Sequence, residues 1–366
     1  MKNSAASVKS CAMIRPCVTF HECPLIRSRH TRTRLAATLT ALVAWTGMAW
    51  TGSALAAPKF ALPIACKPGL DCFVQNYVDR DTGESAVDHR CGGQTYNGHK
   101  GTDIRLRDAR ALAKGVNVLA AARGKVSAVR DGMKDVSIRG ANTANLKGKE
   151  CGNGVVIDHG GGWVTQYCHM RKGSIRVKPG ATVKAGTVLG QVGLSGFTEF
   201  AHLHFEVRRN KDIVDPFTAQ AVSAKAAQGC VPKSSLWTSR AASVLAYRPV
   251  TLLAASFTSG TPTLDGIEQH EPERPTSVSP ALVAWVRILG VRAGDIETLT
   301  VTDPLNRDFA TSGPKTLDRA KAQWLSFAGR KRSVPSWPLG NYKARYTLER
   351  DGKVLLEKEF SFSLVR

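Results

Sequence analysis

Hydrophobic and polar positions alternate along the short stretch "AHLHFEVRR" at residues 201–209. Side chains along a β-strand point to opposite faces with a period of two, so His202, His204 and Glu206 share one face. The apolar residues between them occupy the other face, where they can pack into a core. The pattern predicts a half-buried strand that carries two imidazoles on its polar side.

The segment around this strand has the same character. From about residue 96 to 217, short apolar runs such as "GVVIDHGGGWVTQYCHM" and "ATVKAGTVLGQVG" are broken by glycines. Turn-forming residues recur roughly every 8 to 12 positions, which favours an all-β domain. Residues 133–150 are polar and lack a period, and we interpret them as a long loop of the kind that walls a site.

A second group of strand patterns follows residue 240. The run "YKARYTLE" alternates in character, the dipeptide "DG" then supplies a two-residue hairpin turn, and an alternating return strand follows. The run "ALVAWVRILGV" is typical of a buried strand. We expect a small immunoglobulin-like β-sandwich here. Its one histidine, His270, lies in a Pro/Glu-rich loop, and we expect it to be inert.

The first 56 residues have the pattern of an export signal. Four arginines between residues 27 and 34 precede an apolar run at 35–50, and "ALA" at 54–56 follows as a cleavage site. The run is interrupted by Thr and Gly and falls short of the roughly 20 apolar residues that span a bilayer. We therefore expect a cleaved signal peptide, no stable membrane span, and a periplasmic or secreted protein.

Cysteine usage agrees with export. Six cysteines follow the leader, which in an exported protein predicts up to three disulfides. One pair encloses the turn-rich loop "KPGLD", and another flanks a hairpin pattern. We predict the pairings Cys66–Cys72 and Cys151–Cys168 and leave Cys91 and Cys230 unassigned.

The chain is strongly basic, with a formal net charge of +22. A positive charge of this size suits a polyanionic partner. Nucleic acid is disfavoured by the export signal and by the lack of aromatic residues interleaved with basic ones. An anionic polymer of the cell envelope fits better.

Five polar residues of the central segment could carry chemistry. "GHKGTD" supplies His99 and Asp103, "TQYCHM" ends in His169, and "HLH" supplies His202 and His204. Zinc binds imidazole nitrogen and carboxylate oxygen, and a catalytic zinc has three protein ligands and one open position. Two histidines and one aspartate would complete that set and leave two histidines over.

This ordered pattern resembles the LytM/lysostaphin-type zinc endopeptidases of bacterial cell walls. The matching stretches run from "YNGHKGTDIRL" through "GNGVVIDHGGGWVTQYCHM" to "AHLHFEVRRNKDIVDP", cover about a third of the chain and lack no position of the pattern. The resemblance implies zinc ligands at His99, Asp103 and His204. It also implies that His169 and His202 flank the bound water and stabilise the transition state.

The resemblance further implies the fold and the reaction. The fold class expected is all-β, with a small antiparallel, lysostaphin-like domain containing a groove and the C-terminal sandwich. The expected activity is zinc-dependent hydrolysis of peptide cross-links in peptidoglycan through a metal-activated water. Two other functions stay open: a non-catalytic envelope-binding or amidase-activating module, and a secreted protease that acts on ordinary proteins. The intact set of five residues favours the enzyme.

Polar neighbours of this set have rival interpretations. Glu206 is either a partner of the site or a solvated strand residue, and Tyr167 either contacts substrate or packs in the core. We expect His159 to be structural, since it lies outside the pattern. Ser195 and Thr198 are typical turn formers, because no Ser-His-Asp order surrounds them.

The patterns divide the chain into five parts. They are a signal peptide at 1–56, a cysteine-containing segment at 57–95, the zinc metallopeptidase domain at 96–218, an alanine-containing linker at 219–240 and the β-sandwich at 241–366. Because the predicted metal set is complete by residue 204, we expect a chain that ends near residue 224 to keep the site. The tail would serve to bind a cell-envelope partner.

Overall fold

The computed structural model describes residues 56–366, except 140–142, 223–233 and 271. The predicted signal peptide, apart from its last residue, and Cys230 therefore lie outside the described residues. All described residues belong to one compact unit, Ser53–Arg366. Within them, every helix is too short or too polar to cross a bilayer.

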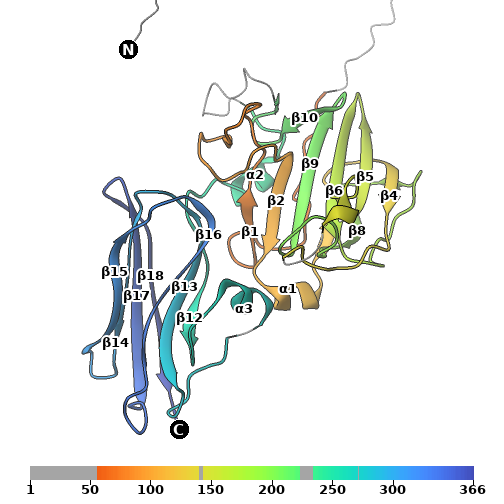
Figure 1. The fold of residues 1–366 in the computed structure, drawn as a ribbon. Coiled ribbons are helices and arrows are strands. Elements are labelled where there is room, and N and C mark those ends of the chain that lie inside the picture. The colour runs from red at the N-terminus through yellow and green to blue at the C-terminus, as the bar shows by residue number, and fades with distance from the viewer. Residues whose placement is uncertain (1–55, 140–142, 223–233, 271) are drawn as a thin grey trace, which may run out of the picture. The chain divides into compact units, whose positions relative to one another are not determined.

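The first domain is built on one antiparallel sheet (Figure 1). Strands β2 (Gly101–Leu106) and β9 (His202–Arg209) are about a hundred residues apart in the sequence but lie side by side in its centre. The full order is β1 (Cys72–Asn76), β2, β9, β6 (Trp163–Met170), β5 (Asn153–Gly160), β4 (Gly124–Arg130) and β7 (Thr182–Val183), with β10 (Asp212–Asp215) and β11 (Gln220–Ala221) at the side.

Short elements surround this sheet. Strands β3 (Asn117–Leu119) and β8 (Val188–Gln191) pair with each other, and helix α1 (Ala109–Lys114) follows β2. The predicted long loop holds a single turn of 3-10 helix, Ala144–Leu146. The strand β1 lies within the cysteine-containing segment 57–95.

The alternation in β9 determines which of its faces is buried in the core. Leu203, Phe205 and Val207 are fully buried in the apolar core of the first domain, as the pattern predicts. The opposite face carries His202 and His204. A shift of one residue in register would exchange these two sets, so burial of the apolar residues fixes the side on which the imidazoles lie.

Both predicted disulfides are confirmed. Cys66 bonds to Cys72, and Cys151 bonds to Cys168. Cys91 is also disulfide-bonded. All five cysteines in the described part of the chain are therefore oxidised.

Residues 236–245 pack in the core of the first domain, although part of this stretch lies in the predicted linker. Leu236 and Trp237 are 2% exposed, and helix α2 (Ser239–Val244) follows them. The Trp237 ring lies 5.4 Å from the Phe205 ring, on the apolar side of β9. We therefore propose a boundary between the two domains near residue 249, and we revise the expectation that a chain ending near residue 224 keeps the site.

Two truncated chains test this boundary. A chain that ends at Ala224 loses Trp237 and Leu236, and each deletion of a large core side chain costs about 3–5 kcal/mol. Domains of this size are stable by only about 5–15 kcal/mol, so we expect this chain to be largely unfolded. A chain that ends at Pro249 keeps these contacts and should unfold cooperatively. Urea unfolding followed by circular dichroism compares them, and equal midpoints would contradict the boundary.

The C-terminal domain consists of two antiparallel sheets, as an immunoglobulin-like sandwich requires. Helix α3 (Leu264–Gln269) joins the first two strands. One sheet contains β12 (Thr251–Thr258), β13 (Ala281–Val291) and β16 (Lys321–Lys331). The other contains β15 (Asp308–Thr316), β14 (Ile296–Thr302), β17 (Gly340–Arg350) and β18 (Lys353–Leu364).

The predicted hairpin of this domain is present. Tyr342, Tyr346 and Leu348 are fully buried between the sheets, and Asp351 and Gly352 both have positive φ, as a two-residue hairpin turn of this type needs. The all-β prediction is thus confirmed for both domains.

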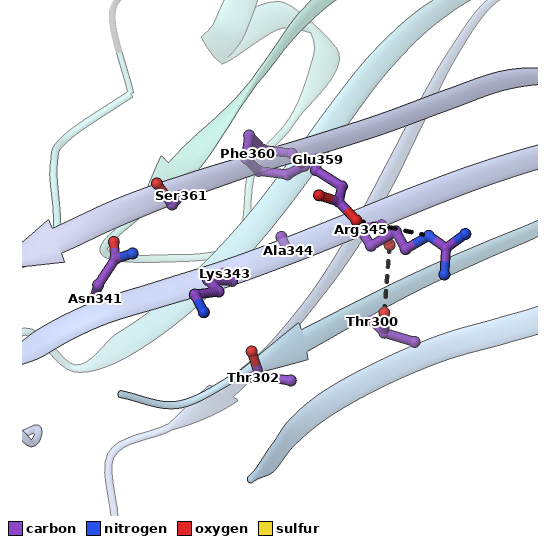
Figure 2. A pocket seen from close by; sticks show the side chains of 9 residues that line it. All are labelled: Thr300, Thr302, Asn341, Lys343, Ala344, Arg345, Glu359, Phe360 and Ser361. Atoms are coloured by element: carbon purple, nitrogen blue, oxygen red, sulfur yellow. Dashed lines mark hydrogen bonds and ion pairs between the residues drawn. The ribbon is translucent and has the colours of Figure 1, made fainter. Parts of the chain in front are cut away.

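The outer face of β14, β17 and β18 carries a cavity of about 480 Å³ (Figure 2). Hydroxyl and charged side chains line it, and Arg345 pairs there with Glu359. Its lining contains no histidine or cysteine.

Candidate metal centre

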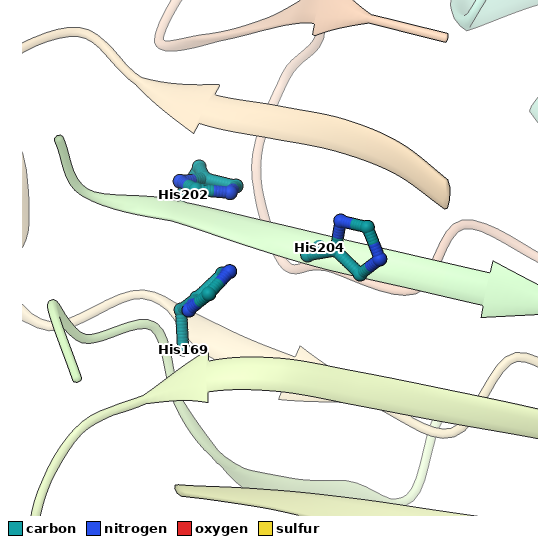
Figure 3. Close-up of side chains that lie close together, drawn as sticks. All are labelled: His169, His202 and His204. Atoms are coloured by element: carbon teal, nitrogen blue, oxygen red, sulfur yellow. The ribbon is translucent and has the colours of Figure 1, made fainter. Parts of the chain in front are cut away.

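The register of three neighbouring strands brings the five predicted residues together. Asp103 on β2 lies opposite His204 on β9, and His204 lies opposite Cys168 on β6, one residue before His169. His99 precedes β2 by two residues. Figure 3 shows His169 on β6 beside His202 and His204 on β9.

Two groups of three possible metal ligands result, and they share His204. One group is His99, Asp103 and His204, and the other is His169, His202 and His204. In each group the ligand atoms lie within 4.8 Å of one another.

The distances within the first group suit a single metal ion. Asp103 Oδ1 lies 3.1 Å from His99 Nε2 and 2.8 Å from His204 Nδ1, and these two nitrogens are 3.3 Å apart. A tetrahedral zinc with bonds of about 2.0–2.1 Å separates its ligand atoms by about 3.3 Å. The donor atoms and their spacing therefore fit one zinc ion.

Neighbouring groups fix the orientation of two of these ligands. His99 Nδ1 donates to the Tyr77 carbonyl at 2.6 Å, which leaves the lone pair on Nε2, the nitrogen that faces Asp103. Asn76 Nδ2 donates to Asp103 Oδ2 at 2.9 Å and leaves Oδ1 for the site. Such outer hydrogen bonds are typical of metal ligands. Both partners come from β1 and its end, and no signal in the sequence placed them beside β2.

Glu206 orients His204, the third residue of the first group. Its carboxylate lies 3.7 Å from His204 Nε2, also pairs with Arg208, and is only 4% exposed. Of the two interpretations left open for Glu206, the structure favours the partner of the site over the solvated strand residue.

The other two histidines are oriented by backbone carbonyls. His169 Nδ1 donates to the Ser195 carbonyl at 2.8 Å, and His202 Nδ1 donates to the Phe200 carbonyl at 2.9 Å. In both rings, Nε2 is therefore the nitrogen that does not bond to the backbone. His202 Nε2 lies 3.3 Å from Asp103 Oδ1, at the edge of the first group of ligands.

His169 has an unusual backbone conformation. Its φ is +60°, a region that few residues other than glycine adopt and that costs of order 1–3 kcal/mol. Its amide donates to the Cys151 carbonyl at 2.8 Å, and the Cys151–Cys168 disulfide lies next to it. Strain of this kind is common where a side chain must be aimed at a site.

The remaining polar neighbours have structural roles. The Tyr167 hydroxyl is buried and accepts from the Ala121 amide at 2.8 Å, so core packing explains this residue. His159 bonds to the Arg123 carbonyl and to Thr165, as expected for a structural residue. The Ser195 hydroxyl bonds to backbone atoms, and Thr198 Oγ1 lies 3.1 Å from His202 Nδ1.

The charges of the site are strongly coupled. Burial alone would raise the pKa of Asp103, but the nearby His99, His202 and His204 outweigh it and hold that pKa well below its ordinary range. Burial, together with the two neighbouring imidazoles, lowers the pKa of His169 well below its ordinary value. Burial would also lower the pKa of His204, but Asp103 and Glu206 raise it to about 9.

This last value predicts how metal affinity depends on pH. Without metal, His204 keeps its proton up to about pH 9, and zinc must displace that proton from the ring. Zinc affinity should therefore rise about tenfold per pH unit between about pH 6 and 9 and then level off. Competition with a chromogenic chelator, corrected for the chelator's own protonation, measures this dependence. An affinity that stays constant over this range would contradict it.

A buried arginine supports His202 from the side. Arg105 lies opposite His202 in the β2–β9 pairing, and its guanidinium lies over the Phe200 ring at 4.7 Å. That ring in turn lies 4.7 Å from the His202 ring. Arg105 Nη2 donates to Glu268 Oε2 of helix α3 at 2.6 Å, so the C-terminal domain contacts this layer. No pattern in the sequence indicated a role for Arg105 or Glu268.

Comparisons with known proteins bear on the same segment. Residues 97–216 match the model of peptidase family M23, which confirms the resemblance for this part of the chain. The chain is 33% identical over 127 residues to the peptidoglycan DD-endopeptidase ShyB of Vibrio cholerae, covering 35% of this chain and 24% of that protein. It is 42% identical over 64 residues to the cell division protein DipM of Caulobacter vibrioides, covering 18% and 10%. The chain thus spans less than a quarter of these relatives' length.

Solved structures with some likeness include two peptidases. A zinc-containing peptidase from Vibrio cholerae is 28% identical, with 39% of each chain covered and a TM-score of 0.25. The catalytic domain of lysostaphin from Staphylococcus simulans is 24% identical, with 38% of this chain and 85% of that chain covered and a TM-score of 0.25.

Proposed function

We propose that the domain matched to peptidase family M23 is a zinc-dependent endopeptidase that hydrolyses peptide cross-links of bacterial peptidoglycan. The observation that carries the proposal is the triangle of His99 Nε2, Asp103 Oδ1 and His204 Nδ1, whose spacing fits zinc. Two further imidazoles, whose Nδ1 atoms donate to backbone carbonyls, lie beside it.

The roles of the five residues follow from these contacts. His99, Asp103 and His204 would hold the zinc, which when bound polarises the scissile carbonyl and lowers the pKa of water. His169 is neutral near pH 7 because burial lowers its pKa, so its Nε2 can accept a proton from the attacking water. The proton then passes to the amine that leaves. In this proposal His202 carries a proton on Nε2 from the start of the reaction, and Nε2 donates it as a hydrogen bond, without transfer, to the oxygen on which negative charge develops.

The proposed substrate rests on charge and on the relatives. The excess of Lys and Arg over Asp and Glu suits peptide stems that carry free carboxylates. One relative is named a peptidoglycan DD-endopeptidase and another a cell division protein. We infer a periplasmic or secreted location for this chain, and a role for the C-terminal domain in contact with the envelope.

Digestion of purified peptidoglycan tests the proposal. The zinc-loaded protein should release fragments whose masses and new amine ends identify a cleaved cross-link. The His159→Ala variant is a matched control, because this histidine lies outside the site. If the protein binds zinc one to one but releases no fragment from any peptidoglycan, the enzyme is excluded and the binding or activating module takes its place. Cleavage of ordinary proteins alone would favour the secreted protease.

A further inference from the structure

A cavity of about 260 Å³ lies between the two domains, away from the histidines. The end of β2 and helix α1 form one wall, and β12, β13 and the segment after α3 form the other. None of the five predicted site residues lines it. Its polar lining consists mainly of Arg107, Arg110, Arg274, Arg287, Ser256 and Trp285.

Two donors at this cavity lack an acceptor. The indole Nε1 of Trp285 and the Nε of Arg107 are buried, and neither has a hydrogen-bond partner among the described residues. Trp285 is only 4% exposed, so water at the surface does not compensate. A buried donor left without a partner costs about 1–3 kcal/mol, and such groups are rare in folded proteins. An acceptor that enters the cavity would remove this cost.

The positive charge around the cavity also favours an anionic ligand. Four arginines line it, and Asp108, which pairs with Arg110, is the one carboxylate in the lining. Arg107 also donates from Nη2 to the Leu70 carbonyl, which neutralises no charge. Arg287 is 1% exposed and donates to Glu268, but Glu268 Oε2 also receives Arg105. One carboxylate thus serves two buried arginines, and positive charge is left in excess beside the cavity.

We propose that this cavity binds a phosphate group, presented as a phosphomonoester. Guanidinium groups favour phosphate because their planar N–H donors match its oxygens. A phosphate offers several strong acceptor oxygens and up to about two negative charges, which matches donors arriving from two domains. A single carboxylate would offer one charge and two oxygens and would leave more of the donors unpaired.

Titration calorimetry of the full chain with inorganic phosphate at low ionic strength tests the site. Trp285→Phe removes the indole donor but keeps a ring, and Arg274→Gln changes an exposed residue that folding does not need. Each variant should weaken phosphate binding by about tenfold or more, as loss of a charge-assisted hydrogen bond does. Arg319→Gln is the matched control, since this arginine is 67% exposed and does not line the cavity. Its affinity should be unchanged.

Phosphate could also bind at the histidine cluster, so each titration is repeated in the His204→Ala chain. Binding that persists there, and that weakens with Arg274→Gln, supports the site in the cavity. Binding that disappears with His204→Ala, or that is equal in all cavity variants, overturns it. Acetate that binds as tightly as phosphate overturns the choice of ligand.

Vesicles separate the sources of the phosphate. If vesicles that contain phosphatidic acid bind the full chain, and the Arg274→Gln variant no longer binds them, the group is a lipid headgroup. If inorganic phosphate binds at the cavity but the vesicles do not, the group belongs to a soluble molecule or a polymer. Either result supports the site.

Discussion

His204→Ala should abolish stable zinc binding, whereas His202→Ala should keep the metal and lose rate. His204 belongs to both possible groups of ligands, so its removal leaves two donors in either one. We expect its zinc affinity to fall by more than about a hundredfold, beyond the effect of losing an outer partner. His202 lies outside the first group, and the loss of one donor to a developing negative charge costs a factor of about 10² to 10³ in rate.

Metal analysis after dialysis, together with turnover on soluble cross-linked muropeptides, measures both effects. The His159→Ala variant should match the unaltered protein in metal content and rate. Equal loss of zinc from the His202 and His204 variants would mean that the second group of ligands holds the metal. Full activity of His202→Ala would leave His169 as the only catalytic imidazole.

Removal of the Glu268 carboxylate should destabilise the protein more than any exposed charge does. Glu268 accepts from two buried arginines, Arg105 and Arg287, and burial lowers the pKa of Arg105 only to about 10, so it stays charged at neutral pH. Breaking a buried ion pair by removal of one partner costs about 3–5 kcal/mol, because the other charge remains buried. Glu268→Ala should lose about this amount.

A neighbouring carboxylate on the same helix is the matched control. Asp265 pairs with Arg139, but both side chains are partly or largely exposed, and such pairs contribute about 0–1 kcal/mol. Urea unfolding of Glu268→Ala, Glu268→Gln and Asp265→Ala compares these losses. Similar midpoints for Glu268→Ala and Asp265→Ala would show that the buried arginines do not depend on Glu268.

Local patterns predicted much of the fold, because the apolar residues of each pattern must be buried in the core. The alternation in β9 decides which residues meet the core, and the "DG" turn fixes the last hairpin. The two disulfides followed from cysteines that flank short loops or a hairpin. The proximity of the five predicted site residues followed from an ordered motif, although their roles stay predictions.

What the sequence did not reveal depends on contacts between distant segments. Asn76 and Tyr77 reach the site only because β1 pairs with β2, and nothing in their local pattern signals this. The stretch around Trp237 follows an alanine-rich run and was predicted to be a linker, yet it packs behind β9. Glu206 gave no sign of burial, because a charged residue at that position of a strand is usually solvated.

The pairing of β2 with β9 also sets when the site can form. Asp103 and His204 are separated by 101 residues in the sequence, and they meet only through this pairing. Contacts of such long range form late, because closing a large loop costs conformational entropy before any favourable contact forms to compensate for it. A nascent or partly folded chain therefore cannot assemble the three donors. Zinc would then bind only after the first domain has folded, and a zinc-dependent hydrolytic activity would begin only at that point.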